Sequence, residues 1–246
     1  MIFRISFSAY IFIVSVLLNQ PSRAEEYHFV SISGLYEQQV GQIIVSQIYK
    51  NLGIDISITH MPGNRAILET VSGRMDGEIM RIESYGRDHP QVLRVPTPYY
   101  NLATMVFYKK GSGIVVNSAE DLAKYSVLKV RGVKHTNNIT AGLTNVYDYD
   151  DTESMLKALD KNRDNVALTH TGDGLFVIEK YQIANIEHRV KPLSVWPLYH
   201  YVHKKNAHLV EKVDRIIREM KASGELDKLT KRAEKKVFEL HGLPLP

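Results

Sequence analysis

Arg81 is a candidate for binding an anionic group. It lies near the end of the run Glu78–Ile82, which alternates polar and apolar residues after a turn rich in Ser, Gly and Asp and is predicted to be a short strand. A guanidinium offers paired planar donors, which match a carboxylate better than an ammonium does. The alternative is a salt bridge from Arg81 to Glu78 or Glu83. Arg87, in the hydrophilic turn that follows, is a second candidate for the same role.

Polar residues also follow two later runs that are predicted to be strands, residues 127–132 and 165–170. After the first run a helix begins, and its backbone N–H groups would form an anion site; an ordinary helix cap by Thr136 is the alternative. After the second run, polar groups would hold the opposite end of a ligand; a helix cap by Asp173 is the alternative. The candidates at these two places are Lys134, His135, Thr136, Asn137, His170, Thr171 and Asp173.

Four aromatic residues are candidate apolar walls of the same site: Tyr36, Tyr99, Tyr100 and Trp196. Tyr99 and Tyr100 are near one predicted connection between two parts of the chain, and Trp196 is near another. Packing at a hinge is therefore the alternative for these three residues.

Other site chemistries lack support in the sequence. The chain has no cysteine, which removes thiolate catalysis and cysteine-ligated zinc. Among its ten histidines, His200 and His203 are three apart on a predicted strand and would point to opposite faces. There is no phosphate-binding loop and no Gly-x-Ser-x-Gly motif. We therefore expect no metal site, no cofactor and no catalytic activity.

The positions of the candidate binding residues depend on two successive α/β blocks. Strands alternate with helices from residue 28 to residue 100 and again from residue 103 to residue 193, and a strand and two helices follow. The pattern predicts two lobes joined by two extended crossings. Ligands of open α/β sheets lie beyond the carboxyl ends of the strands. Arg81 and the segments after residues 132 and 170 all have that position, so we expect them to meet in one cleft between the lobes.

The first 24 residues have the pattern of a cleavable secretory signal peptide. Arg4 is followed by an apolar run of about 14 residues, too short to span a membrane, and then by Ser22-Arg23-Ala24, a small-x-small cleavage site. Without Arg4 and Arg23, 29 basic residues stand against 27 acidic ones, a net charge of +2 that gives no reason to expect a nucleic-acid partner. A periplasmic location fits best.

Several motifs occur in an order that resembles one known family. They are "NLGIDISIT", "PGNRAILETVSGRMDGE", "VPTPYY" before "VFYKKG", "SAEDLAKYSVLKVRGV", "LKALDKNRDNVALTH" and "YHYVHKKNAHLVEKVDRIIREMKASGELDKL". In this order they resemble the extracellular solute-binding proteins of family 3, the amino-acid receptors of ABC importers.

The resemblance implies an α/β, two-lobed type II periplasmic binding fold with two hinge crossings. Residues 25–105 and 198–246 would form lobe I, and residues 106–197 would form lobe II. It also implies a monomer that captures a small, polar, carboxylate-bearing solute, such as an amino acid, for an inner-membrane ABC permease or a sensor. A periplasmic enzyme on the same fold, similar to cyclohexadienyl dehydratases, is one alternative. A degenerate lobe pair that binds a protein partner is another.

The motifs differ from the family pattern at the site. The family's carboxylate-binding Arg follows a Thr in a Thr-x-x-Arg segment, whereas Arg87 has about that place without the Thr. The family's amino-group Asp follows the strand that corresponds to residues 165–170. His170 or Thr171 stands there, and Asp173 comes slightly later.

Overall fold

The computed structural model describes residues 26–162 and 165–243, so the predicted signal peptide lies outside the described residues. One mixed sheet runs through the molecule in the order β2-β1-β3-β10-β5-β8-β6-β7, with β4 paired to β10 and β9 paired to β5. The strands are β1 (Tyr27–Ile32), β2 (Ile56–Met61), β3 (Gly77–Ile82), β4 (Val92–Arg94), β5 (Tyr100–Lys109), β6 (Ser126–Val130), β7 (Val146–Tyr149), β8 (Asn165–His170), β9 (Ile186–His188) and β10 (Ser194–His203).

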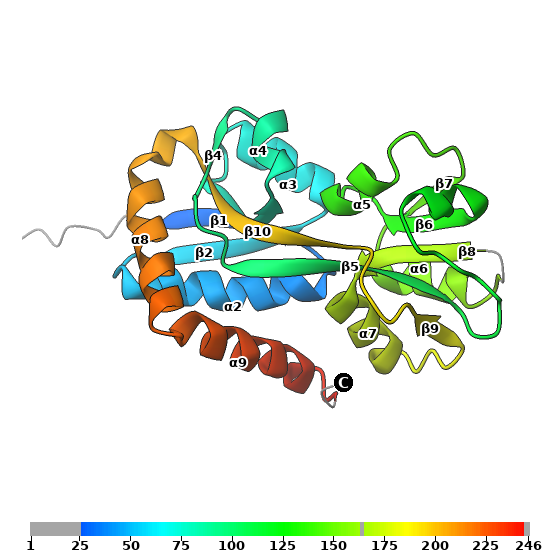
Figure 1. Cartoon of the computed structure of the whole chain (residues 1–246). Helices are drawn as coiled ribbons and strands as arrows, with labels where there is room; N and C mark the ends of the chain where they lie inside the picture. The colour runs from blue at the N-terminus through cyan, green and yellow to red at the C-terminus, as the bar shows by residue number, and fades with distance from the viewer. Residues whose placement is uncertain (1–25, 163–164, 244–246) are drawn as a thin grey trace, which may run out of the picture.

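Two blocks share this sheet (Figure 1). The first block contains β1 to β4 with α2, α3, α4, α8 and α9, and the second contains β6 to β9 with α5, α6 and α7. The helices are α2 (Tyr36–Asn51), α3 (Gly63–Val71), α4 (Ser84–Asp88), α5 (Lys134–Ile139), α6 (Thr152–Leu159), α7 (Thr171–Lys180), α8 (His208–Ala222) and α9 (Glu225–Leu240). Short 3₁₀ helices cover Glu120–Lys124 and Lys204–Asn206.

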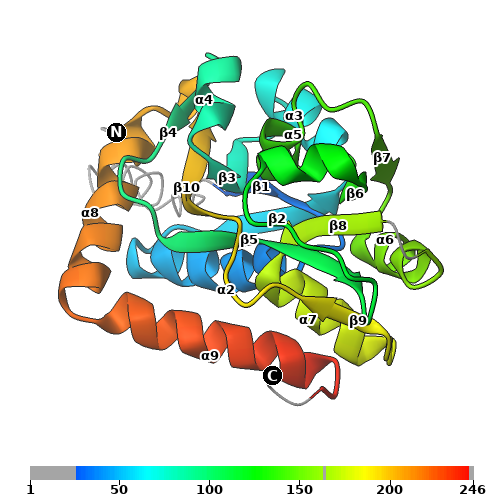
Figure 2. The same cartoon turned by 45° about the vertical axis from the view of Figure 1, so that its right-hand side comes forward.

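The predicted alternation of strands and helices is confirmed within each block. In the first block β1 pairs in parallel with β2 and β3, and in the second β6 pairs in parallel with β7 and β8. Parallel strands need a helical crossover between them, which the intervening helices supply. In both views α3, α4 and α5 lie on one side of the sheet, and α2, α7 and α9 lie on the other (Figure 2).

Two long strands, β5 and β10, cross from one block to the other. They pair antiparallel over residues 100–104 and 194–198. β5 then continues along β8, and β10 continues along β3 and β4. The two predicted crossings are therefore neighbouring strands of one sheet.

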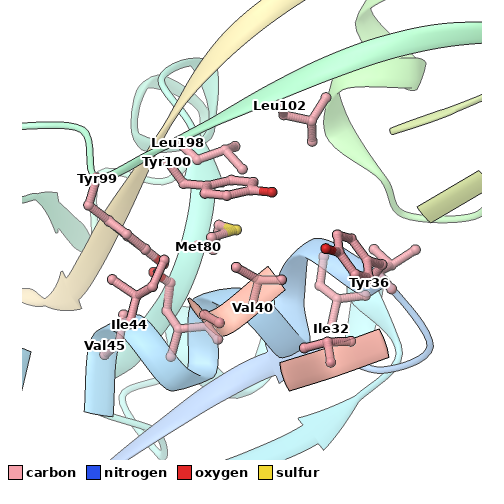
Figure 3. Close-up of a cluster of buried hydrophobic side chains, with 14 of the residues drawn as sticks. Ile32, Tyr36, Val40, Ile44, Val45, Met80, Tyr99, Tyr100, Leu102 and Leu198 are labelled. Carbon is pink, nitrogen blue, oxygen red and sulfur yellow. The ribbon is translucent and has the colours of Figure 1, made fainter. Parts of the chain in front are cut away.

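The first block has its core between α2, the sheet and the two C-terminal helices. Val40, Ile44 and Ile48 recur every fourth residue of α2, so one helical face is buried. Figure 3 shows this face with Met80 of β3 and Leu198 of β10. The packing fixes the start of α2 beside the ends of β1 and β3.

Some predicted boundaries are wrong. The turn at Pro62-Gly63-Asn64 predicts a helix over residues 65–71 capped by Asn64, but α3 already begins at Gly63, with Pro62 before it. The run "VLRVPTPYY" predicts a strand over residues 92–100, but β4 is limited to Val92–Arg94. Pro96 and Pro98 have no backbone N–H to donate to a neighbouring strand. The run "YHYVHKK" predicts a strand over residues 199–205, but β10 begins five residues earlier, at Ser194, because it pairs with the start of β5.

Candidate functional site

A small pocket lies where the two blocks meet, and we call it the interblock pocket. Its volume is about 30 Å³. The start of α2, the ends of β1 and β3 and both crossing strands line it from one side, and the start of α5 lines it from the other. The lining residues are Ile32, Leu35, Glu37, Gln38, Met80, Arg81, Ile82, Leu102, Val133, Lys134, His135 and Leu198.

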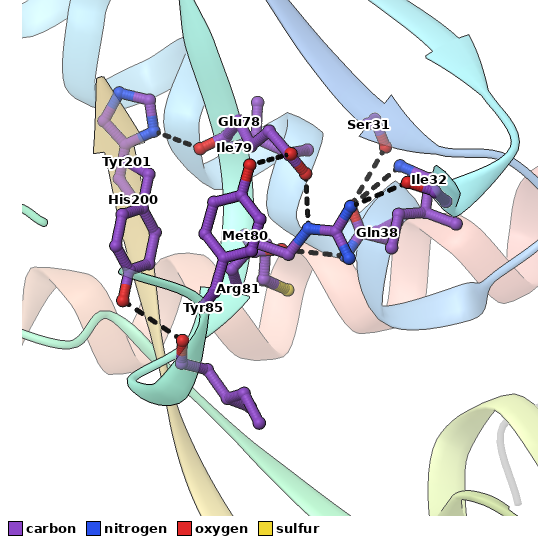
Figure 4. Close-up of polar contacts among 12 residues, drawn as sticks. Ser31, Ile32, Gln38, Glu78, Ile79, Met80, Arg81, Tyr85, His200 and Tyr201 are labelled. Atoms are coloured by element: carbon purple, nitrogen blue, oxygen red, sulfur yellow. Dashed lines mark hydrogen bonds and ion pairs between the residues drawn. The ribbon is translucent and has the colours of Figure 1, made fainter. Parts of the chain in front are cut away.

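Arg81 reaches this pocket from β3, and its side chain is 3% exposed. Its Nε donates to the carboxylate of Glu78, and one terminal nitrogen donates to the Gly63 carbonyl at 3.2 Å. The Tyr85 hydroxyl donates to the other oxygen of Glu78 (Figure 4). The guanidinium of Arg81 therefore lines the interblock pocket and is also salt-bridged to Glu78, the alternative predicted from the sequence.

Gln38 fixes the same corner of the first block. Its amide oxygen accepts from the backbone N–H of Ile32 at 3.1 Å and from the hydroxyl of Ser31 at 3.3 Å. Its amide nitrogen donates to the carbonyl of Met80 at 3.2 Å (Figure 4). These contacts tie the start of α2 to β1 and β3 at the pocket wall of the first block.

Glu37 is a site residue that the sequence reasoning missed. Its side chain lines the interblock pocket, is 2% exposed and leaves Oε2 without a hydrogen-bond partner among the described residues. Burial, reinforced by the nearby charge of Asp173, raises the pKa of Glu37 to about 8. The sequence carried one signal for this residue: Glu37 is acidic and stands in the first turn of α2, which begins just after the carboxyl end of β1.

Asp173 is fully buried at the contact between α2 and α7. Its carboxylate accepts from the backbone N–H of Tyr36 at 3.0 Å, and from the hydroxyls of Thr152 and Thr169. Burial raises the pKa of Asp173 above its ordinary value. Two buried carboxyl groups, Glu37 and Asp173, therefore lie close together at the boundary between the blocks.

The four candidates of α5 divide into two pairs. Lys134 and His135 line the interblock pocket, whereas Thr136 and Asn137 do not. Lys134 forms an ion pair with Asp88 of α4. The ring of His135 is 2.8 Å from the hydroxyl of Thr104 through Nδ1, and burial lowers its pKa to about 3, so this imidazole is neutral.

Thr136 and Asn137 have partners within the second block. The hydroxyl of Thr136 donates to the Val133 carbonyl at 3.0 Å, and the Asn137 amide oxygen accepts from the Lys129 ammonium at 2.7 Å. They hold the first turn of α5 in place behind the pocket.

The sequence was also compared with models of known protein families. The model of the bacterial extracellular solute-binding proteins, family 3, matches residues 36–234. The chain belongs to this family. No curated protein sequence matches it significantly. Within the described residues, no helix is both long enough and apolar enough to cross a membrane, and no three His, Cys, Asp or Glu residues are grouped as metal ligands would be.

Solved structures with low sequence identity have the same fold. A variant of ArgBP from T. maritima has a TM-score of 0.71 at 18% identity, over 86% of this chain and 95% of that one. A putative ABC-transporter binding component from Wolinella succinogenes, complexed with lysine, has a TM-score of 0.70 at 16% identity, over 85% and 95%. A histidine kinase sensor domain similar to periplasmic binding proteins has a TM-score of 0.73 at 14% identity, over 86% and 97%. The predicted type II periplasmic binding fold is confirmed.

The two candidate arginines of this family 3 member lie in different places. Arg81 lines the interblock pocket, whereas Arg87 is exposed at the end of α4 and does not line it. The reason is local: Arg81 belongs to β3, which runs into the block boundary, and Arg87 is on the short helix after it. The Asp88 carboxylate beside Arg87, not Arg87 itself, contacts the second block through Lys134.

The other candidates gather near the crossing strands. His170 and Thr171 contact β5, because the His170 ring nitrogen Nδ1 lies 3.2 Å from both the backbone nitrogen and the carbonyl oxygen of Ala103, and the Thr171 hydroxyl donates to the same carbonyl. Together with Tyr36, Tyr99 and Tyr100, His170 lines a second pocket, described below. Trp196 on β10 lines neither pocket and donates to the Ser194 hydroxyl at 2.7 Å.

Proposed function

We propose that this protein captures a small amino-acid-like solute between its two blocks and delivers it to an inner-membrane ABC importer or a sensor. The observation that carries the proposal is the presence of Arg81, Glu37 and His135 in one buried pocket formed by both blocks. Arg81 would hold the solute carboxylate, and Glu37, whose pKa burial raises to about 8, would ionise beside the ammonium group of the solute. Such charge-assisted hydrogen bonds gain strength when water is excluded.

The proposal includes a hinge motion about the two crossing strands. The interblock pocket has about 30 Å³, close to the share of liquid volume taken by one water molecule and far below that of an amino acid. A solute would therefore enter after the blocks separate, as lobes I and II, and they would close on it afterwards. We propose residues 25–105 and 198–246 as lobe I and residues 106–197 as lobe II.

The proposed role is binding without turnover, by a periplasmic monomer released from its signal peptide. The ArgBP and lysine-complexed relatives support an amino-acid ligand, and the sensor-domain relative supports sensing as the variant role. Family membership supports an extracellular place of action.

A thermal-shift screen with amino acids, small di-acids and polyamines tests the proposal. A solute at about a hundredfold excess over Kd stabilises the folded state by about 2.7 kcal/mol. For a chain of this size that raises Tm by roughly 5–10 °C. Mass spectrometry of the recovered solute then separates binding from catalysis, because a converted solute would contradict the binding role.

One observation favours a second candidate, a degenerate pair of lobes that binds a protein partner. The interblock pocket is small, and most of its lining side chains are apolar: Ile32, Leu35, Met80, Ile82, Leu102, Val133 and Leu198. In the same screen this candidate predicts no shift with any solute. A shift that is lost in the Arg81→Ala variant would rule it out.

A further inference from the structure

A second pocket lies on the other side of the crossing strands, among α2, α7 and α9, and we call it the hinge pocket. Its volume is about 510 Å³. It shares no lining residue with the interblock pocket. Its lining residues come from both blocks and from β5: Tyr36, Tyr99, Tyr100, Asn101, His170, Gly172, Asp227, Thr230, Glu234 and Phe238.

The hinge pocket has aromatic walls. The Tyr36 ring is stacked with the His170 ring at 6.4 Å between centroids and an interplanar angle of 27°. The same Tyr36 ring meets Phe238 edge-on at 5.3 Å, and Tyr100 meets His170 edge-on at 6.1 Å. Figure 3 shows the rings of Tyr36 and Tyr100, which come from α2 and from the start of β5. Aromatic faces attract organic cations through the ring quadrupole.

The pocket also carries negative charge that no ion pair among the described residues balances. Asp227 and Glu234 line it from α9, and neither forms an ion pair with a described residue. The Tyr100 hydroxyl donates to Glu234 Oε1 at 2.9 Å, which orients this carboxylate. No described lining residue is Lys or Arg, and burial lowers the pKa of His170 to about 4, so its imidazole is neutral.

We propose that the hinge pocket binds a compact organic cation, an ammonium group that carries apolar substituents. Glu234 would face the charge, and the rings of Tyr36 and Tyr100 would contact the substituents. The pocket volume suits a group larger than a metal ion, and no three His, Cys, Asp or Glu side chains of the described residues are grouped there as metal ligands would be. The occupant would contact both blocks. This proposal does not rest on the proposed solute in the interblock pocket.

Two probes of matched shape test the cation requirement. Choline and 3,3-dimethylbutan-1-ol differ in having a positive nitrogen or a neutral carbon at the centre of the same branched group. In isothermal titration of the mature protein we expect choline to bind at least about tenfold more tightly than the alcohol, because only choline carries a charge that the Glu234 carboxylate and the aromatic faces attract. Equal affinity of the two probes, or no choline binding at millimolar concentration, would overturn the proposal.

Three variants test the location. Glu234→Gln keeps the side-chain size and should weaken choline binding at least about tenfold. Glu239→Gln, on the same helix and outside the pocket, is the matched control and should leave it unchanged. Glu37 lines the interblock pocket and not the hinge pocket, so Glu37→Gln should weaken solute binding there and change choline binding much less than Glu234→Gln does. If choline binding depends on Glu37 and not on Glu234, the hinge pocket is not the cation site. The melting temperature of each variant verifies folding.

Discussion

The backbone N–H of Tyr36 donates to the carboxylate of Asp173 at 3.0 Å and so joins the first residue of α2 to the first turn of α7. The two residues are 137 positions apart and belong to different blocks. Asp173 is held in turn by the hydroxyls of Thr152 and Thr169 within the second block. One buried carboxylate therefore contributes directly to keeping the blocks together.

The first prediction concerns this contact. Asp173→Asn replaces one acceptor oxygen by a donor, so at least one of three donors loses its partner. We expect a loss of about 1–3 kcal/mol in the free energy of unfolding, measured by urea denaturation. Asp150→Asn, at an exposed ion pair with Arg131, should cost at most about 1 kcal/mol. Similar losses in both variants would argue against a special role for Asp173.

The second prediction separates the two arginines. Arg81→Ala should weaken solute binding at least about thirtyfold, since losing one partner of a buried charge pair costs about 2–5 kcal/mol. The change also leaves Glu78 buried without its cation, so the melting temperature should fall. Arg81→Lys retains the positive charge and serves as the folded comparison. Arg87→Ala should change the affinity less than about twofold, because Arg87 lies outside the interblock pocket. The reverse order in calorimetry would assign the anion to Arg87.

The third prediction is a pH dependence from Glu37. Its pKa rises from 4.5 to about 8 on folding, so between these values the folded protein binds a proton that the unfolded chain does not. The stability that this proton provides is complete below about pH 4.5 and is lost as the pH rises towards 8. Between pH 6.5 and 8, wild type should lose up to about 1.4 kcal/mol per pH unit relative to Glu37→Gln.

Urea denaturation of both proteins across that window measures the difference. Glu239→Gln, at an exposed position, should follow wild type. Parallel curves for wild type and Glu37→Gln would show that Glu37 is ionised in the folded protein throughout.

The fourth prediction concerns a close approach between the blocks. Gly132 has φ +77°, and a Cβ there would lie 2.9 Å from Asn64 Oδ1 and 3.1 Å from its backbone nitrogen. Gly132→Ala should cost at least about 1 kcal/mol from the left-handed backbone alone. It should also loosen the closed arrangement, with a larger radius of gyration in small-angle scattering. Gly142→Ala, also at positive φ (+83°) but in open space, is the control and should change stability without changing the radius.

Much of the fold could be predicted from local patterns. The helical face of Val40, Ile44 and Ile48 and the strand over residues 165–170 follow from periodicity and from turn residues, which depend on near neighbours in the chain. The positions of Arg81 and His135 near the ends of strands follow from the same patterns. The predicted ends of elements were wrong where pairing between distant segments sets them. An example is the start of β10, which pairs with β5.

The candidate site was predicted less completely. Glu37 looks like an ordinary acidic residue in a first helical turn, and Glu234 looks like part of a solvated, charged helix. Both acquire their surroundings only when α2, α7 and α9 pack together. One partner of Asp173 is the backbone N–H of Tyr36, 137 residues away, and no side-chain pattern in the sequence predicts this contact.

The sequence by itself determined the order of the elements, the family and the two candidate arginines, because periodicity, turn residues and motif order are properties of contiguous segments. Only the tertiary structure decided which charges are paired, which carboxyl groups lose water, and that the aromatic residues near the crossings line a separate pocket. Burial and charge pairing depend on what packs around a side chain, and for Asp173 and Glu234 those neighbours come from segments more than 100 residues away.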